Sequence, residues 1–380
     1  GHGFGRPDHV QVAGGIDALV AYRIMGGIAI GMVSIISPMY ISEIAVAKYR
    51  GRLVAMYQLA ITIGFMGAYL VNYYLLQGSL SGRHFQSPHL ELAFVTEVWR
   101  AMLGMEALPA ILFLAVVFFI PESPRWLLVR GRQQSAVRIL EKINNSLQSA
   151  QAEAGEIIAQ LAGQRARNSY RLVFGAGYRK VLLIGVAIAI LGQFMGVNAV
   201  LYYGPTIFKN SGLSDGDSLF YQVLVGLVNM LTTVLALFII DRVGRKKLVY
   251  YGVSGMVLSL VCIGFFFWRG EAWHWPTTVL LVLFLFYVFC CAVSVSAVVF
   301  VLLSELYPNA VRGAAMSIAG FSLWVGTYLI GQLTPWMLTA LTPAGTFWLF
   351  AGMCLPYLYI IWKMVPETTG KSLEEIEKMW

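Results

Sequence analysis

Long apolar runs separated by short polar segments make up most of the chain. Nine of these runs approach or exceed the roughly 20 residues that a helix needs to cross the hydrocarbon core of a bilayer. We therefore predict nine membrane-spanning helices, near residues 17–40, 52–76, 99–120, 178–204, 219–240, 248–268, 277–303, 314–338 and 345–365.

The composition agrees with a membrane protein. Of 380 residues, 58% are apolar and 12% are charged, and the mean hydropathy is +0.70. Soluble globular chains average about 25% charged residues, because their whole surface meets water. The composition therefore excludes a soluble globular protein and makes the bilayer the main partner.

The net charge of +8 could suggest a nucleic-acid partner, but the basic residues gather on alternate connections between the runs. One side of the membrane holds Lys48, Arg50, Arg52, the Arg-rich stretch 125–180, Arg242, Arg245, Lys246, Lys247, Arg312, Lys371 and Lys378, and the other holds Arg83, Lys209 and Arg269. Cytoplasmic loops are enriched in Lys and Arg. We expect a multi-pass protein of the inner or plasma membrane with a cytoplasmic C-terminus and no nucleic-acid partner.

Residue types that carry enzyme chemistry are sparse. Four cysteines, Cys262, Cys290, Cys291 and Cys354, lie inside predicted spans without metal-ligand spacing. No nucleophile–base pair, metal cluster or phosphate-binding loop is visible. We expect a protein that is not an enzyme and needs no cofactor or metal.

A polar insert separates two apolar halves. Within residues 121–176, apolar side chains recur at helical spacing, as in Val137, Leu140 and Ile143. This pattern favours short amphipathic helices on the cytoplasmic face, although the insert could equally be a simple tether. The expected parts are an incomplete N-terminal bundle at 1–120, a linker at 121–176, a six-helix bundle at 177–365 and a tail at 366–380.

The two halves repeat each other. Ser42 and Ser304 each start a Ser-Glu pair and each lie eight residues before an Arg-Gly pair, and the triplets at 121–123 and 366–368 also correspond. Parallel repeats of this kind build two-bundle carriers. However, Arg245 precedes Glu305 by 60 residues, whereas Arg6 precedes Glu43 by 37. We therefore expect a twelve-span protein whose first two spans lie upstream and whose third is missing near residues 7–15.

Several motifs together identify a family. They are Pro-Glu-Ser-Pro-Arg-Trp-Leu at 121–127, Asp-Arg-Val-Gly-Arg-Lys at 241–246, Pro-Glu-Thr-Thr-Gly-Lys at 366–371, Gln193-Phe194 with Gly196 and Asn198, and Tyr202-Tyr203. From about residue 16 to the end, the chain resembles the sugar porter family of the major facilitator superfamily, nearest to bacterial proton–xylose symporters. The resemblance implies an all-α, two-bundle membrane fold that moves a monosaccharide by alternating access, as a monomer.

Acidic and basic residues lie together at the predicted cytoplasmic ends of the spans. They are Glu43, Arg50, Glu122, Arg125, Asp241, Arg242, Arg245, Glu305, Arg312 and Glu367. The resemblance assigns them to a cytoplasmic gate that holds the outward-open state. Exposed ion pairs contribute about 0–1 kcal/mol each, so such a gate can open readily. The alternative is the general enrichment of cytoplasmic loops in Lys and Arg. That enrichment does not explain why acidic residues recur beside the basic ones at the same spacing in both halves.

Uncharged polar groups within the spans are candidates for sugar binding. Amides donate and accept hydrogen bonds, as sugar hydroxyls do. The resemblance implies that the sugar cavity is lined by Gln58, Gln193, Asn198, Asn229, Phe300 and Trp324, with Tyr202 and Tyr203 near its outer gate. For any one amide, including Gln222, a hydrogen bond between helices is the alternative.

This chain departs from the xylose-symporter pattern at several of these positions. Gly192 and Phe65 replace glutamines, Leu323 replaces the glutamine before Trp324, and Ser296, Ala297 and Phe300 replace a Gly-Pro pair and a Trp. The cavity should therefore be drier and differently shaped, and the identity of the sugar stays open.

Proton coupling would depend on charges inside the spans. Arg23 and Glu106 are costly at membrane depth and so indicate function. In symporters of the family, the arginine at the Arg23 position pairs with an aspartate of the first helix, which is not in this chain. Glu106 could instead satisfy Arg23 or a backbone group. The sequence thus favours a proton-coupled sugar symporter and leaves a facilitator or a non-transporting sugar receptor as alternatives.

Overall fold

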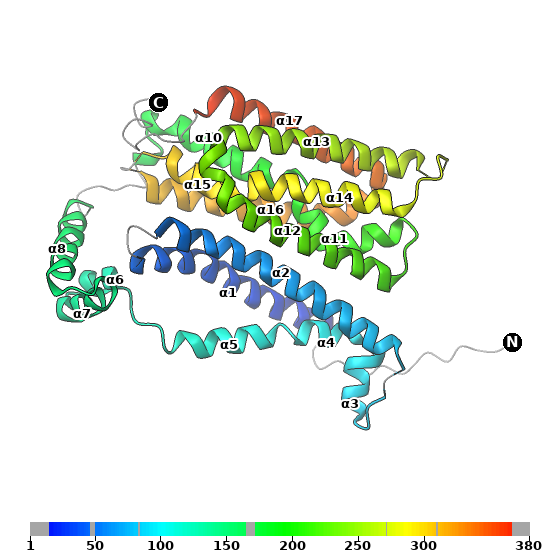
Figure 1. Ribbon diagram of the computed structural model, residues 1–380, viewed down its shortest axis with the longest axis horizontal. Helices are drawn as coiled ribbons and strands as arrows, with labels where there is room; N and C mark the ends of the chain where they lie inside the picture. The colour runs from blue at the N-terminus through cyan, green and yellow to red at the C-terminus, as the bar shows by residue number, and fades with distance from the viewer. Residues whose placement is uncertain are drawn as a thin grey trace. The chain divides into compact units, whose positions relative to one another are not determined.

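The computed structural model describes residues 15–45, 50–82, 84–164, 172–270, 272–308 and 311–366, and the regular elements within them are helices (Figure 1). Among these residues, nine stretches are long and apolar enough to cross a membrane. They are Asp17–Ile41, Met56–Leu80, Val98–Val117, Gly177–Asn210, Asp215–Ile240, Arg245–Arg269, Thr277–Leu303, Arg312–Ala340 and Thr342–Met364. The nine predicted spans are therefore confirmed in length and composition.

The chain divides into two compact units. The first contains residues 1–57 and 121–163, and the second contains residues 58–120 and 164–380. Helix α2 (Arg50–Leu80) belongs to both units, because the boundary falls between Tyr57 and Gln58.

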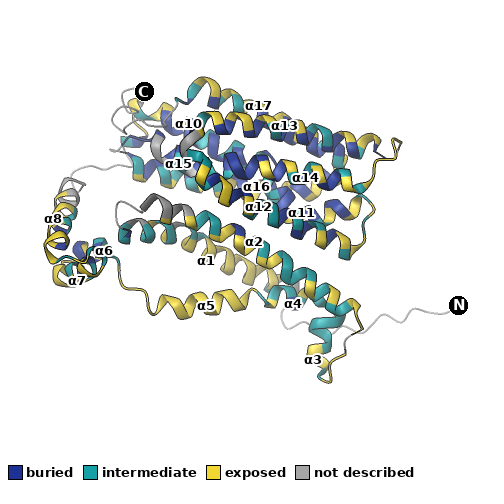
Figure 2. Cartoon of the chain, viewed as in Figure 1, coloured by how far each residue is buried: buried dark blue, intermediate teal, exposed yellow. Residues whose placement is uncertain are grey.

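The first unit holds α1 (Gly15–Ile44) and three short helices of the polar insert. Most described side chains of α1 are exposed or half-buried (Figure 2), as expected of a helix that faces lipid or other membrane helices. The hydroxyl of Tyr57, at the start of α2, donates to the backbone oxygen of Ser34 at 3.2 Å. This contact joins α1 to the first turns of α2.

The insert forms its own small core. Helices α6 (Pro124–Val129), α7 (Gln133–Asn144) and α8 (Leu147–Gln164) pack through Leu127, Leu140 and Ala154, which are buried almost completely. Asn145 ends α7 in the left-handed conformation that favours asparagine and glycine. The predicted amphipathic helices are thus present, and their apolar faces bury one another.

The main core of the second unit lies among the helices of the second sequence half. These are α10 (Ala176–Phe194), α11 (Val197–Asn210), α12 (Asp215–Val243), α13 (Arg245–Arg269), α14 (Thr277–Cys291), η2 (Ala292–Ser296), α15 (Ala297–Leu306), α16 (Arg312–Ala340) and α17 (Thr342–Met364). Buried residues such as Ile188, Met256, Phe284 and Phe347 fill the space between them. Figure 2 shows the buried faces turned inward.

The segment between α2 and the insert is less regular than a single predicted span. It contains α3 (Pro88–Glu91), η1 (Leu92–Thr96), α4 (Val98–Gly104) and α5 (Ala107–Val117). Pro109 has no N–H to give the backbone oxygen of Met105, so the helical ladder is interrupted at Met105–Glu106. The apolar run near 99–120 therefore becomes two helices rather than one.

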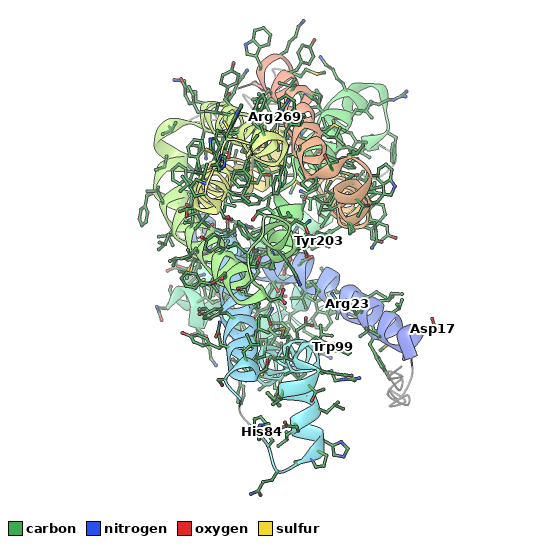
Figure 3. The ribbon with its side chains drawn as sticks, turned by 90° about the vertical axis from the view of Figure 1, so that its right-hand side faces the viewer. Asp17, Arg23, His84, Trp99, Tyr203 and Arg269 are labelled. Carbon is green, nitrogen blue, oxygen red and sulfur yellow. The ribbon has the colours of Figure 1, made fainter. Side chains whose placement is uncertain are left out.

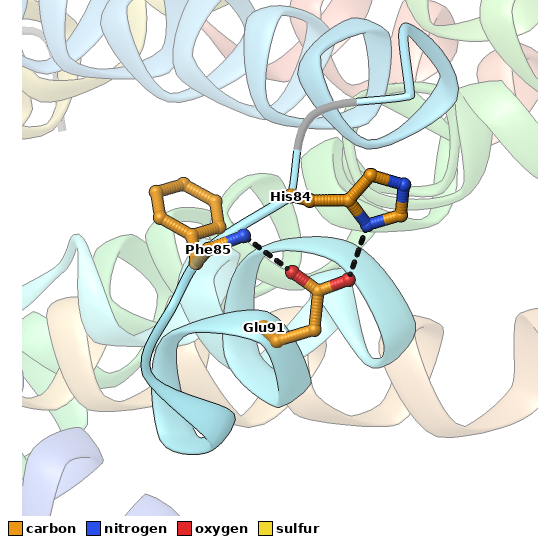
Figure 4. Close-up of polar contacts among 3 residues, drawn as sticks. All are labelled: His84, Phe85 and Glu91. Carbon is orange, nitrogen blue, oxygen red and sulfur yellow. Dashed lines mark hydrogen bonds and ion pairs between the residues drawn. The ribbon is translucent and has the colours of Figure 1, made fainter.

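Before α3, a short loop is held by one carboxylate. Glu91 accepts hydrogen bonds from the backbone N–H of Phe85 at 2.7 Å and from Nδ1 of His84 at 3.0 Å (Figure 4). These contacts, the Phe85 N–H first, lower the pKa of the Glu91 carboxyl below its usual value.

Candidate functional site

The fourth apolar run is broken in its middle, where the sequence predicts one span. Helix α10 ends at Phe194 and α11 begins at Val197. Gly196 between them has φ +90°, and a Cβ there would lie 2.4 Å from the ring of Phe350. Both the positive φ and the close ring require glycine at this position. Discontinuous membrane helices of this kind form binding sites in transporters.

Three uncharged polar side chains meet at this break. Nδ2 of Asn198, in the first turn of α11, donates to Oε1 of Gln193 at 2.7 Å. The hydroxyl of Thr327, on α16, lies 3.1 Å from the same oxygen and 3.0 Å from the backbone oxygen of Leu323. Gly326 lets α16 approach, since a Cβ there would lie 3.2 Å from Cγ of Gln193. The structure thus brings together two residues that the sequence singled out and adds Thr327.

The remaining candidate amides occupy different surroundings. Asn229 on α12 is 7% exposed, and its backbone oxygen accepts from Thr233 at 2.8 Å. Gln58 on α2 is half-buried. Gln222 on α12 is buried and donates to the backbone oxygens of Leu201 and Val200 at 3.1 and 3.4 Å, so it joins two helices.

Three of the aromatic candidates, Tyr202, Tyr203 and Trp324, lie on α11 and α16. The hydroxyl of Tyr203 donates to the backbone oxygen of Gly331 at 2.8 Å, which ties α11 to α16. Tyr202 is 48% exposed and its ring lies 6.3 Å from that of Phe65 on α2. Trp324 is 42% exposed, one turn before Thr327. The Phe300 side chain lies outside the described part of the chain.

The two charges proposed for proton coupling lie in different units. Arg23 projects from α1 in the first unit (Figure 3), and Glu106 precedes α5 in the second. Both side chains are exposed. Their pairing stays a prediction. A second charged pair, Glu97 with Arg100, begins α4, where the Arg100 guanidinium lies 4.6 Å from the ring centre of Trp99.

In the first unit, the predicted gate residues meet the start of the insert. The Ser123 hydroxyl donates to Oε2 of Glu43 and accepts from the Trp126 N–H at 3.3 Å, so it caps α6 while holding the carboxylate. Glu122 lies 3.9 Å from Arg132, and Arg125 is half-buried. The Tyr40 hydroxyl adds a hydrogen bond to the backbone oxygen of Pro121 at 2.7 Å.

In the second unit, basic side chains hold backbone carbonyls at helix ends. Nε of Arg312 donates to the Tyr307 oxygen at 3.1 Å. Nζ of Lys246 donates to the oxygens of Trp362 and Val365 at 2.8 and 2.9 Å, which binds the start of α13 to the end of α17. Arg245 is half-buried. Glu367 and the side chains of Arg50, Asp241, Arg242 and Glu305 lie outside the described residues.

Ser123 and Thr327 are site residues that the sequence analysis missed. A serine directly before a proline that opens a helix is a recognisable N-cap signal, so Ser123 could have been found. Thr327 sits in an apolar helix with no local signal, and its partner Gln193 is 134 residues away. In the described part of the chain, no group of three or more His, Cys, Asp or Glu could hold a metal ion.

Comparison with known proteins decides the family. Residues 10–380 match the family described as Sugar (and other) transporter. The chain belongs to the sugar transporter family. It is 39% identical to the D-xylose-proton symporter of Escherichia coli K12, over 98% of this chain and 73% of that protein. It is also 35% identical to the arabinose-proton symporter of Bacillus subtilis, over 96% of this chain and 75% of that protein.

Solved structures give the same result for the fold. The inward-open conformation of the E. coli xylose transporter matches with a TM-score of 0.77 and 38% identity, covering 95% of this chain and 72% of that one. The same transporter bound to 6-bromo-6-deoxy-D-glucose matches with a TM-score of 0.75, at 95% and 74% coverage. The chain is therefore a multi-pass membrane sugar transporter with the major facilitator superfamily fold, as the motifs predicted.

Proposed function

We propose that this sugar transporter carries a monosaccharide by alternating access and couples that movement to protons. The observation that supports the substrate class most is the polar cluster of Gln193, Asn198 and Thr327 at the break between α10 and α11. The cluster is uncharged, so it suits a neutral solute that carries many hydroxyl groups. Relatives named for xylose, arabinose and glucose make pentoses and hexoses the candidate substrates.

The hydrogen bonds within the cluster determine which of its donor and acceptor groups remain available to a sugar. Oε1 of Gln193 already faces the Asn198 amide and the Thr327 hydroxyl. The two Nε2 hydrogens of Gln193 then serve as donors to a sugar oxygen. Gln58, Asn229, Phe300 and Trp324 complete the proposed cavity, and Tyr202 and Tyr203 form its outer gate.

The proposed cytoplasmic gate includes Glu43, Glu122, Arg125, Arg245 and Arg312, together with Arg50, Asp241, Arg242, Glu305 and Glu367. The bond from Ser123 to Glu43 supports it, because it links a span end to the insert. Polar contacts near the headgroups can be broken at small free-energy cost when the inner mouth opens. In this proposal the basic loops, the insert and the C-terminus are cytoplasmic, because cytoplasmic loops are enriched in Lys and Arg.

Proton coupling is proposed for Arg23 and Glu106. In this proposal Arg23 acts on the first-helix aspartate that the family resemblance implies, and Glu106 holds Arg23 in place in one state of the cycle. An arginine lowers the pKa of a carboxyl group that approaches it. If the approach occurs in one state of the transport cycle and not in the other, the carboxyl group binds a proton on one side of the membrane and releases it on the other. The relatives named as xylose-proton and arabinose-proton symporters support proton coupling as such.

Counterflow tests the transport function. The protein is reconstituted into vesicles loaded with unlabelled D-xylose, L-arabinose or D-glucose, and uptake of the labelled sugar is followed. A carrier accumulates label transiently, because the unlabelled sugar drives exchange. A sugar receptor binds its ligand but exchanges none across the membrane, so an absence of counterflow with every candidate sugar would contradict the proposal.

Facilitated diffusion is the second candidate. Within its own unit, Arg23 forms no ion pair with any described residue. A facilitator would also show counterflow, so counterflow does not separate it from a symporter. The two candidates are separated by whether protons move with the sugar.

A further inference from the structure

A proline leaves one backbone oxygen of α11 without its helical partner. Pro205 lies inside α11 and has no N–H, so the oxygen of Leu201, four residues earlier, receives no hydrogen bond from the helix ladder. The ring of an internal proline also pushes this carbonyl outward. A buried carbonyl without a partner costs free energy, so its partner should be sought elsewhere in the fold.

Two side chains from other helices donate hydrogen bonds to this oxygen. The Tyr69 hydroxyl, on α2, donates to the Leu201 oxygen at 2.8 Å. Nε2 of Gln222, on α12, donates to the same oxygen at 3.1 Å. Both lone pairs of the carbonyl are thereby used, and three helices meet at one atom. All of these residues belong to the second unit.

Two glycines make the arrangement possible. A Cβ at Gly204 would lie 1.9 Å from Oε1 of Gln222, and a Cβ at Gly226 would lie 2.6 Å from the ring of Tyr69. A side chain at either position would therefore displace one of the two donors. The ring of Phe65, one turn before Tyr69, lies beside Tyr69 at 6.0 Å and beside Tyr202 at 6.3 Å.

We propose that Tyr69 and Gln222 are positioning residues of transport, which hold α11 at its proline through the Leu201 oxygen. We call the two hydrogen bonds from Tyr69 and Gln222 to the Leu201 oxygen the tether. Tyr202 and Tyr203 directly follow Leu201, so the tether sets where these tyrosines lie relative to α2. The polar cluster at Gln193 is held by its own hydrogen bonds to Asn198 and Thr327, so we expect it to persist when the contacts to the Leu201 oxygen are lost. The inference rests on the proposed transport function and assigns a new role within it.

The tether should govern the rate of transport and leave sugar affinity unchanged. Tyr69→Phe keeps the ring and deletes one hydrogen bond. We expect the maximal rate of sugar counterflow to fall about 3- to 10-fold, the equivalent of one buried hydrogen bond. The sugar concentration at half-saturation should stay within about 2-fold of the parent. A variant that was merely destabilised would instead lose protein from the membrane.

Pro205→Ala supplies the control. It restores an N–H at position 205, which can satisfy the Leu201 oxygen within α11. We expect Tyr69→Phe to slow counterflow by less than about 2-fold in the Pro205→Ala background. Equal slowing in both backgrounds, or no slowing in the parent, would overturn the proposal. Counterflow by the parent itself reports separately on the proposed transport function.

The same double-mutant cycle can be measured by stability. The parent, Tyr69→Phe, Pro205→Ala and the double variant are purified in detergent, and their melting temperatures are compared. The loss caused by Tyr69→Phe should be larger with Pro205 than with alanine, because only the alanine background has an N–H at position 205 that can replace the lost hydroxyl as a donor to the Leu201 oxygen. This reading applies even where a variant no longer transports sugar. Additive losses would contradict a shared partner at Leu201.

Discussion

The side chains of Asn198 and Gln193 are joined across a break in a membrane span, with Nδ2 of Asn198 donating to Oε1 of Gln193 at 2.7 Å. Each stands beside the turn at Gly196, one at the end of α10 and one at the start of α11. The turn removes regular helix hydrogen bonds at this depth, and the two amides provide polar groups there. Both side chains are half-buried, and the proposed sugar site uses the donors and acceptors that this pair provides.

Replacing Gln193 by alanine should weaken sugar binding. The substitution removes the Nε2 donors and leaves Nδ2 of Asn198 without its acceptor. We expect a loss of roughly 1–3 kcal/mol in binding free energy, measured by titration of the purified protein with the transported sugar. The amount of protein in the membrane should change little. Unaltered affinity would show that the amide serves helix packing alone.

Thr327→Val tests whether the hydroxyl orients Gln193. Valine keeps the shape of threonine and removes the hydroxyl, so we expect a smaller loss of sugar affinity, about 0.5–1.5 kcal/mol. Thr334→Val is the matched control, because Thr334 lies on the same helix and its hydroxyl bonds to the Ile330 oxygen of its own helix. Equal effects of the two substitutions on affinity would exclude a specific role for Thr327.

The membrane-spanning stretches of the chain could be predicted from local sequence. Apolar runs such as 277–303 are long enough to cross a bilayer whatever surrounds them, and the nine spans follow from this property. The break at Gly196 was not predicted, because the two amides Gln193 and Asn198 beside it do not interrupt the apolar stretch Gly177–Asn210, whose hydropathy is that of a continuous span. Gly196 has φ +90° in the break, and the ring of Phe350, 154 residues later, leaves no room for a Cβ there.

The candidate site was predicted in part. Gln193, Asn198 and Asn229 could be singled out because amides are rare inside apolar runs. Thr327 and the Leu201 oxygen could not be singled out from the sequence. A threonine in a span and a backbone carbonyl carry no local signal, and their hydrogen-bond partners are known only once the helices are packed. Pro205 carried a signal, because a proline inside a helix always frees a carbonyl four residues earlier. Which donors would take that oxygen depends on tertiary packing.

Ser123→Ala should destabilise the start of the insert. The substitution removes the cap of α6 and the hydrogen bond to Glu43 together. Loss of a serine cap costs about 0.5–2 kcal/mol, so we expect a lower melting temperature. Ser135→Ala, at an exposed position on α7, is the control and should leave the melting temperature unchanged. Equal melting temperatures for the parent and Ser123→Ala would contradict the capping role.

The loop before α3 should loosen in acid. The pKa of the folded Glu91 carboxyl is lowered, so its contacts stabilise the loop above the usual carboxyl pKa of about 4.3. That contribution is lost as the pH falls through the lowered value. We expect amide hydrogen exchange of residues 84–91, corrected for the intrinsic rate, to accelerate over this acid range. Glu91→Gln should exchange fast throughout, and a step that persists in this variant would assign the effect to another group.

Arg23→Leu separates proton-driven uptake from exchange. Without the arginine's charge, the partner carboxyl group should keep its proton in both states of the cycle. We expect uphill accumulation of sugar to be abolished, while exchange between two equal pools of sugar should partly survive because it needs no net proton movement. Loss of both activities with normal protein levels would place Arg23 in sugar binding or gating instead.

Proton movement in cells tests the central claim most directly. De-energised cells that express the parent protein are given a transported sugar in a weakly buffered medium, and the external pH is recorded. A proton-coupled sugar carrier takes up protons with the sugar, so the medium should become more alkaline, and the change should be absent in cells that lack the protein. Sugar entry at an unchanged external pH would contradict coupling and identify the protein as a facilitator.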